Sequence, residues 1–170
     1  MAVSATELDL VNAALRRVGA RAIAAVSDST PSGALAGDVV SFEREDLLRA
    51  HPWNFATART GLTRLAATPA FEFEYAYGLP ADWLRTVAVH DNDAGLGTLI
   101  YKHESVLVSA TWTPAILTDA EEVWLRYVRA TSDVNIMPSA FRKVLILRLA
   151  KIFAINPSNS TTLYQVLDEE

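Results

Sequence analysis

The chain of 170 residues is 51% hydrophobic and 21% charged, a balance typical of a globular protein and not of a disordered one. Its net charge of −5 argues against tight binding to nucleic acid, because duplex-binding domains carry a basic surface, although a passive encounter with DNA stays open. The absence of cysteine excludes disulfides, thiolate metal sites and cysteine nucleophiles.

No segment of the sequence predicts contact with a membrane. The first ten residues lack the basic and apolar regions of a secretory signal, and no apolar run reaches the roughly eighteen residues that a spanning helix needs. We therefore expect a protein that stays in the cytoplasm where it is made and has no membrane partner.

Two amphipathic helices are predicted near the N-terminus. Ser4 and Glu7 have the spacing of a capping box at the start of the first helix, and Gly19 stands where a left-handed C-terminal cap is expected. The second helix is predicted from about Pro31 to Ala50, with Thr30 as its N-cap.

A proline interrupts the amphipathic stretch that follows, from Phe42 to Leu65. Pro52 removes a backbone donor and disfavours the helical conformation of the residue before it. Trp53 and Phe55 come next, and large rings at a change of chain direction are more often core than ligand platforms. Apolar residues then recur at helical spacing: Phe55, Ala58, Leu62 and Leu65. We predict that Pro52, Trp53 and Phe55 form a structural joint and that a helix resumes after it.

The hydrophobic period changes from helical to alternating after Pro69. Four rings then fall on one side of a predicted strand: Phe71, Phe73, Tyr75 and Tyr77. Such rings are ordinary core about as often as they are an interaction surface. The remaining β elements are predicted as a strand at 83–90, a hairpin of 98–101 and 106–109 with its turn at 102–105, a loop at 112–122 that begins with Trp112, and a strand at 123–129.

Helices return in the C-terminal part of the sequence. Pro138 opens a helix with a broad apolar stripe, and residues 156–160 break it. A short final helix carries Leu163, Tyr164 and Leu167 on one face, and it either folds back on the other helices or docks on a partner.

The order of these elements predicts a single α+β domain over residues 1–170. In this prediction the N-terminal and C-terminal helices, at about 4–67 and 138–168, form a helical bundle. A small antiparallel β-sheet is inserted between them at about 71–130.

No residue pattern predicts a catalytic, cofactor-binding or metal site. The histidines, His51, His90 and His103, lie in different elements without a partner at metal-ligand spacing. Asp91–Gly95 resembles the start of a calcium loop, but Lys102 stands at the twelfth position, where such a loop needs glutamate. The sequence also lacks a phosphate-binding loop and a serine nucleophile motif. We therefore expect a protein that is not an enzyme and uses no cofactor.

Several sequence blocks form a pattern that extends over nearly the whole chain. They are Leu10–Gly19 (LVNAALRRVG), Leu47–Ala56 (LLRAHPWNFA), Tyr75–Asp82 (YAYGLPAD) and Arg148–Ala150 (RLA). The pattern resembles the phage head–tail adaptor family, and within that family it is most similar to the tail tubular A proteins of short-tailed phages. The HPWNF motif is the most specific part of the resemblance.

The resemblance implies a structural virion protein that forms a dodecameric ring beneath the capsid portal. The ring would extend the channel through which DNA passes and would offer a platform to a tail or nozzle protein. Because the C-terminal region of such rings docks on the portal, the resemblance implies a portal interface at Leu163, Tyr164 and Leu167. The candidates for a subunit or tail interface are Phe71, Phe73, Tyr75, Tyr77 and Trp112.

Two other functions stay open at the level of sequence. The first is a small protein-binding module or an assembly chaperone for virion assembly, in which the sheet recruits one partner. The second is an enzyme whose catalytic residues are dispersed along the chain. A ring on the portal would support the adaptor, whereas a one-to-one complex would support the module.

Overall fold

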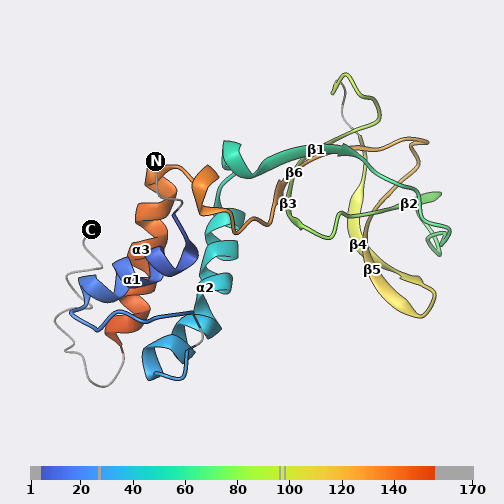
Figure 1. Cartoon of the computed structure of the whole chain (residues 1–170). Helices are drawn as coiled ribbons and strands as arrows, with labels where there is room; N and C mark the ends of the chain where they lie inside the picture. The colour runs from blue at the N-terminus through green and yellow to red at the C-terminus, as the bar shows by residue number, and fades with distance from the viewer. Residues whose placement is uncertain (1–4, 27, 96, 98, 156–170) are drawn as a thin grey trace. The chain divides into compact units, whose positions relative to one another are not determined.

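The computed structural model describes residues 5–26, 28–95, 97 and 99–155 (Figure 1). The chain divides into two compact units. One unit joins the residues up to Ala50 with those from Thr131 onward, and the other is His51–Ala130. Described residues form three α-helices and two three-stranded antiparallel sheets. The predicted fold, a bundle with one small inserted sheet, is therefore wrong.

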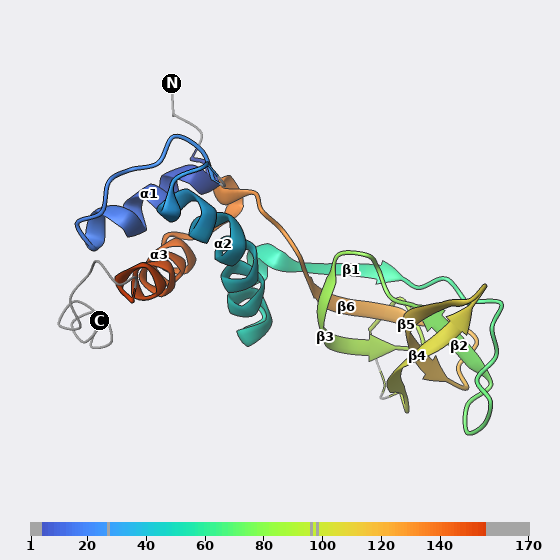
Figure 2. The ribbon, with the colours of Figure 1, turned by 90° about the horizontal axis from the view of Figure 1, so that it is seen from below.

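The first unit contains α1 (Glu7–Arg17), α2 (Pro31–Ala50) and α3 (Ser139–Ala154), as Figure 2 shows. Helix α3 packs against both α1 and α2. Apolar side chains from all three helices are almost fully buried between them, which is the main favourable term in the folding of this unit. The largest are Val11, Leu15, Val40, Leu48, Phe141, Leu145 and Leu149.

Side-chain caps fix where the first two helices begin. Thr6 and Asp9 form a capping box at α1, since each side chain accepts a hydrogen bond from the backbone N–H of the other residue. The predicted box began at Ser4, which lies outside the described residues. The predicted bounds of α2 and its cap are confirmed, because Thr30 Oγ1 accepts a hydrogen bond from the N–H of Gly33 at 3.1 Å. Gly19 has the predicted left-handed conformation, with φ +70°.

The second unit contains two sheets. In the first, the strand order is β1 (Thr57–Gly61), β6 (Trp124–Arg129), β3 (Trp83–His90). In the second, it is β2 (Tyr75–Gly78), β5 (Thr111–Thr118), β4 (Lys102–Val108). Side chains of both sheets share one hydrophobic cluster: Tyr77, Val89, Ile116, Val123, Leu125 and Tyr127. The sheets are therefore held together by a common core.

Strand β3 has the bounds predicted for it, and β6 begins one residue later than predicted. The prediction that a helix resumes after Pro52 is wrong. A short 3₁₀ helix, Asn54–Ala56, leads directly into strand β1. Ala58 and Leu62 pack against the core shared by the two sheets. Their sequence spacing is helical, but pairing with β6 supplies the backbone hydrogen bonds of an extended chain.

The predicted hairpin is also displaced. Strands β4 and β5 run through the segments expected to be a turn at 102–105 and a loop at 112–122. The actual turn is Ser109–Ala110, and both residues have positive φ, 47° and 67°. Turns of this kind normally carry asparagine or glycine, so the sequence contains no signal for this one.

None of the helices within the described residues has both the length and the apolar composition needed to cross a membrane.

Candidate functional site

Three large apolar side chains are exposed around one hollow of the β unit. Phe71 precedes β2 and is 80% exposed, Leu107 of β4 is 53% exposed, and Trp112 of β5 is 68% exposed. All three line a hollow of ≈ 310 Å³ beside the β4–β5 hairpin, which we call the hairpin hollow. Leu107 and Trp112 are direct partners across the hairpin, so their side chains share one face.

The floor of the hairpin hollow is a buried cluster. Phe73, Val106 and Leu117 line the hollow and belong to the cluster that also contains Ala76 and Ala115. Because this floor is packed on the strands themselves, the exposed residues above it stand on a rigid support. An aromatic anchor in a well-packed depression is the usual centre of a protein interface.

The rim of the hairpin hollow is partly acidic. Glu72 and Glu104 line it, and the carboxylate of Glu72 forms an ion pair with Lys102 at 2.7 Å. The hydrogen bond that the Lys102 ammonium donates to Glu72 raises the pKa of Lys102 above its ordinary value. A partner that places an apolar side chain in the hollow and a basic residue near Glu104 would match this surface.

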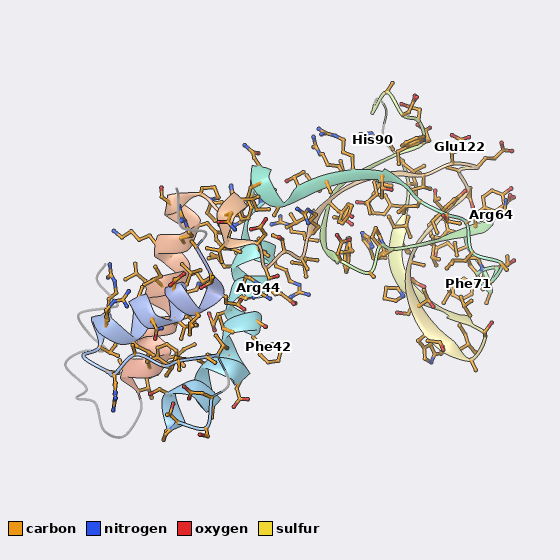
Figure 3. The ribbon with its side chains drawn as sticks, in the orientation of Figure 1. Phe42, Arg44, Arg64, Phe71, His90 and Glu122 are labelled. Carbon is orange, nitrogen blue, oxygen red and sulfur yellow. The ribbon has the colours of Figure 1, made fainter. Side chains whose placement is uncertain are left out.

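The five rings predicted as an interface do not lie together. Phe71 and Trp112 line the hairpin hollow, with Phe71 at the edge of the β unit (Figure 3). Phe73 is buried in the floor of the same hollow, whereas Tyr77 is buried in a different cluster, the core shared by the two sheets. Tyr75 is half-buried, and the guanidinium of Arg64 lies 3.5 Å from the centre of its ring.

The chain turns sharply in the middle of this aromatic stretch, which explains why its rings separate. Glu72 has φ 73°, so the residues before Tyr75 are not extended and β2 begins only there. Leu107 was not predicted as a site residue. The sequence nevertheless contains a signal for its exposure, the three consecutive apolar residues Val106–Val108. Side chains alternate along a strand, so the middle one of three points away from the other two.

The joint residues Pro52, Trp53 and Phe55 stand at the start of the second unit. Trp53 and Phe55 are half-buried, with ring centres 6.3 Å apart. The Thr57 hydroxyl donates a hydrogen bond to the carbonyl of Trp53 at 2.8 Å, which fixes the entry into β1. The segment therefore connects a helix to a strand instead of joining two helices.

The predicted portal interface at Leu163, Tyr164 and Leu167 lies outside the described residues.

Groups of three or more histidine or acidic side chains that could hold a metal are absent from the part of the chain that the structure describes. His103 packs against the rings of Trp83 and Tyr101, with ring centres 5.6 Å and 5.5 Å away. Partial burial lowers the pKa of His103 below its ordinary value.

Comparison of the sequence with models of known protein families finds no match. Comparison with curated proteins likewise finds no match.

Proposed function

We propose that this protein is a structural component of a virion. In this proposal it forms a head–tail adaptor ring, a dodecamer, which joins the capsid portal to a tail or nozzle protein and extends the DNA channel. The protein would be made in the host cytoplasm and reside in the neck of the virion. DNA would pass through the ring without specific binding.

The observation that carries the proposal is the hairpin hollow. Exposed phenylalanine and tryptophan beside a packed apolar floor are costly in water and are typical of a surface that another protein covers. The resemblance of the HPWNF and YAYGLPAD blocks to adaptor sequences supports an assembly in which such a surface is needed. The acidic net charge supports a channel in which phosphate groups slide and are not held.

The proposal is tested by mixing the purified protein with purified portal and imaging the product by negative-stain microscopy. We expect a ring on the portal. A one-to-one complex, measured by mass photometry, would instead favour a protein-binding module or an assembly chaperone. Absence of any complex with portal would contradict both.

The role of the hairpin hollow is tested by a matched pair of variants. The double variant Phe71→Ala with Trp112→Ala should lower binding of the tail protein or of the neighbouring copy by about tenfold or more, as expected for interface anchors. Phe42→Ala is the control, because Phe42 is 75% exposed on α2, outside the hollow. Equal losses in both variants would mean that the hollow is not the binding surface.

A further inference from the structure

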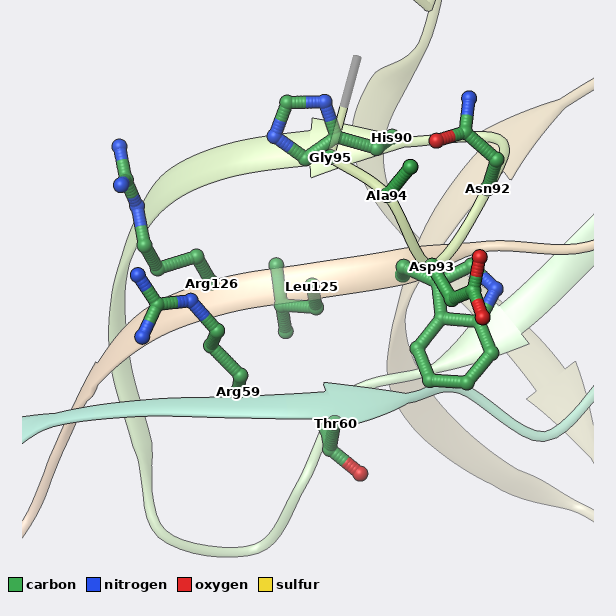
Figure 4. A pocket seen from close by; sticks show the side chains of 10 residues that line it. Arg59, Thr60, His90, Asn92, Asp93, Ala94, Gly95, Leu125 and Arg126 are labelled. Atoms are coloured by element: carbon green, nitrogen blue, oxygen red, sulfur yellow. The ribbon is translucent and has the colours of Figure 1, made fainter.

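Two arginines face each other on the sheet formed by β1, β6 and β3. Arg59 of β1 and Arg126 of β6 are direct partners in the antiparallel register. Their side chains therefore extend from the same face, and they line one hollow of ≈ 220 Å³ together with His90 (Figure 4). We call this the arginine hollow. Like charges directly opposite each other on neighbouring strands are destabilising unless a counter-charge lies near them.

Within the described part of the chain, no ion pair neutralises either arginine. Asp93 lines the same hollow but lies beyond ion-pair distance of both guanidiniums. Two buried nitrogens also have no hydrogen-bond partner among the described residues, Nε of Arg126 and Nδ1 of His90. A buried donor without an acceptor is costly, so the geometry favours a ligand that brings acceptors.

The chemistry of the arginine hollow selects an oxyanion. Guanidinium groups are planar forks of donors that match the two oxygens of a carboxylate or of a phosphate. The two arginines carry +2, which two carboxylates balance, and Asp93 at the edge of the hollow lowers its own charge to about +1. A nucleic acid is disfavoured, because its row of phosphates would also meet the acidic remainder of a chain with net charge −5.

Matching carboxylates are present on the same unit. Glu121 and Glu122 precede β6, are exposed, and form no ion pair with any described residue. Arg64 lines a hollow with them, but its guanidinium lies over the ring of Tyr75. Trp124, which is 38% exposed, lines both this hollow and the arginine hollow. Each copy thus presents two unpaired cations and two unpaired anions on either side of a partly exposed indole.

We propose that the arginine hollow binds Glu121 and Glu122 of a second copy of this chain. The inference rests on the proposed ring, since neighbouring copies must meet at this surface for the contact to form. A contact between two different patches, repeated from copy to copy, closes into a ring when the rotation between neighbours allows it. The charges then fix which face of one copy meets the next.

A charge-exchange experiment tests the contact. The first variant is Arg59→Glu with Arg126→Glu, and the second is Glu121→Arg with Glu122→Arg. Each variant alone places like charges at every contact, so we expect loss of rings on the portal in negative-stain images. An equimolar mixture restores opposite charges at every contact, so rings of alternating copies should return.

The control for charge alone is Arg16→Glu with Arg21→Glu, two exposed positions of the other unit. This control should form rings as the unmodified protein does. Circular dichroism melting of each variant establishes that it is folded. Rings formed by either charge variant alone, or no recovery in the mixture of folded variants, would overturn the inference and leave the proposed adaptor function standing.

A second measurement separates the two proposals when the unmodified protein forms no ring. The sequence has no cysteine, so each engineered cysteine is the single thiol of its chain, and chains tagged to differ in size distinguish the mixed dimer from dimers of one variant. Arg126→Cys and Glu122→Cys, mixed as separate concentrated chains with a short bismaleimide, should give a cross-linked dimer without portal. The control pair is Arg16→Cys with Glu122→Cys. Equal cross-linking in both mixtures would overturn the inference.

A final experiment tests whether the arginine hollow binds a phosphate group instead of a carboxylate. Inorganic phosphate and a short DNA duplex are titrated into the unmodified protein and into the Arg59→Glu, Arg126→Glu variant by calorimetry. We expect no duplex binding at physiological salt. Duplex binding that depends on both arginines, with copy-to-copy cross-linking no higher than in the control pair, would assign the arginine hollow to nucleic acid and overturn the proposal.

Discussion

Replacing Tyr77 by alanine should destabilise the β unit severely. Tyr77 is 1% exposed and lies in the cluster shared by the two sheets. Removing a fully buried aromatic ring costs about 3–5 kcal/mol. The Tyr77 hydroxyl also donates a 2.7 Å hydrogen bond to the carbonyl of Ala120, and its loss adds about 1 kcal/mol. The expected total of about 4–6 kcal/mol is comparable with the whole stability of a small domain.

Tryptophan fluorescence measures this loss in the β unit alone. All four tryptophans, Trp53, Trp83, Trp112 and Trp124, lie within His51–Ala130. Urea unfolding followed by fluorescence therefore reports the β unit, whereas helical circular dichroism reports mainly the other one. Tyr77→Phe is the control that removes only the hydroxyl, and it should cost about 1 kcal/mol. A loss below about 1 kcal/mol for Tyr77→Ala would refute the shared core of the two sheets.

Three further outcomes are expected. Phe141→Ala, which removes a fully buried ring of α3, should cost about 3–5 kcal/mol by circular dichroism and leave the fluorescence transition in place. Ala110→Gly should stabilise the β unit by roughly 1 kcal/mol in urea unfolding, because its φ of 67° is strained for any residue with a Cβ. Burial raises the pKa of both Tyr77 and Tyr127, so the folded state holds these protons more tightly than the unfolded chain does. The contribution of these two groups to the free energy of unfolding should therefore be constant below the ordinary tyrosine pKa of about 10 and fall above it, less steeply in Tyr127→Phe.

Local signals in the sequence predicted the helices α1, α2 and α3. The bounds of α2 follow from Thr30, Pro31 and the proline at position 52, all of which act within a few residues. The bounds of strand β3 were also predicted correctly. These elements are determined by capping, backbone restriction and short hydrophobic patterns, which a sequence displays directly.

The predictions that are wrong depend on contacts between distant residues. The spacing of Phe55, Ala58 and Leu62 fits a helix, and only the pairing of Thr57–Gly61 with β6 makes this segment a strand. Likewise, the turn at Ser109–Ala110 carries no turn residue and is imposed by the register of the hairpin.

Because the candidate site also depends on contacts between distant residues, only part of it could be predicted from the sequence. Phe71 and Trp112 were predicted from their size and position, but the sequence does not show that Glu72 turns the chain and buries Phe73. The pairing of Arg59 with Arg126 depends on the register between β1 and β6, and neither residue is distinctive by itself. A charged pair of this kind becomes visible only when the strands are in place.

The hairpin hollow and the arginine hollow should respond to salt in opposite ways. Ion pairs at a partly exposed surface weaken as ionic strength rises, because the Debye length falls to about 3 Å at 1 M. Apolar contacts persist in salt and are strengthened by sulfate. Raising sodium sulfate should therefore reduce the cross-linking between Arg126→Cys and Glu122→Cys, while binding that depends on Phe71 and Trp112 is kept or increased. A parallel fall in both signals would mean that one surface serves both contacts. A one-to-one module needs only one such surface, whereas a ring subunit needs one for its neighbour and another for its partner, so two independent salt responses favour the ring.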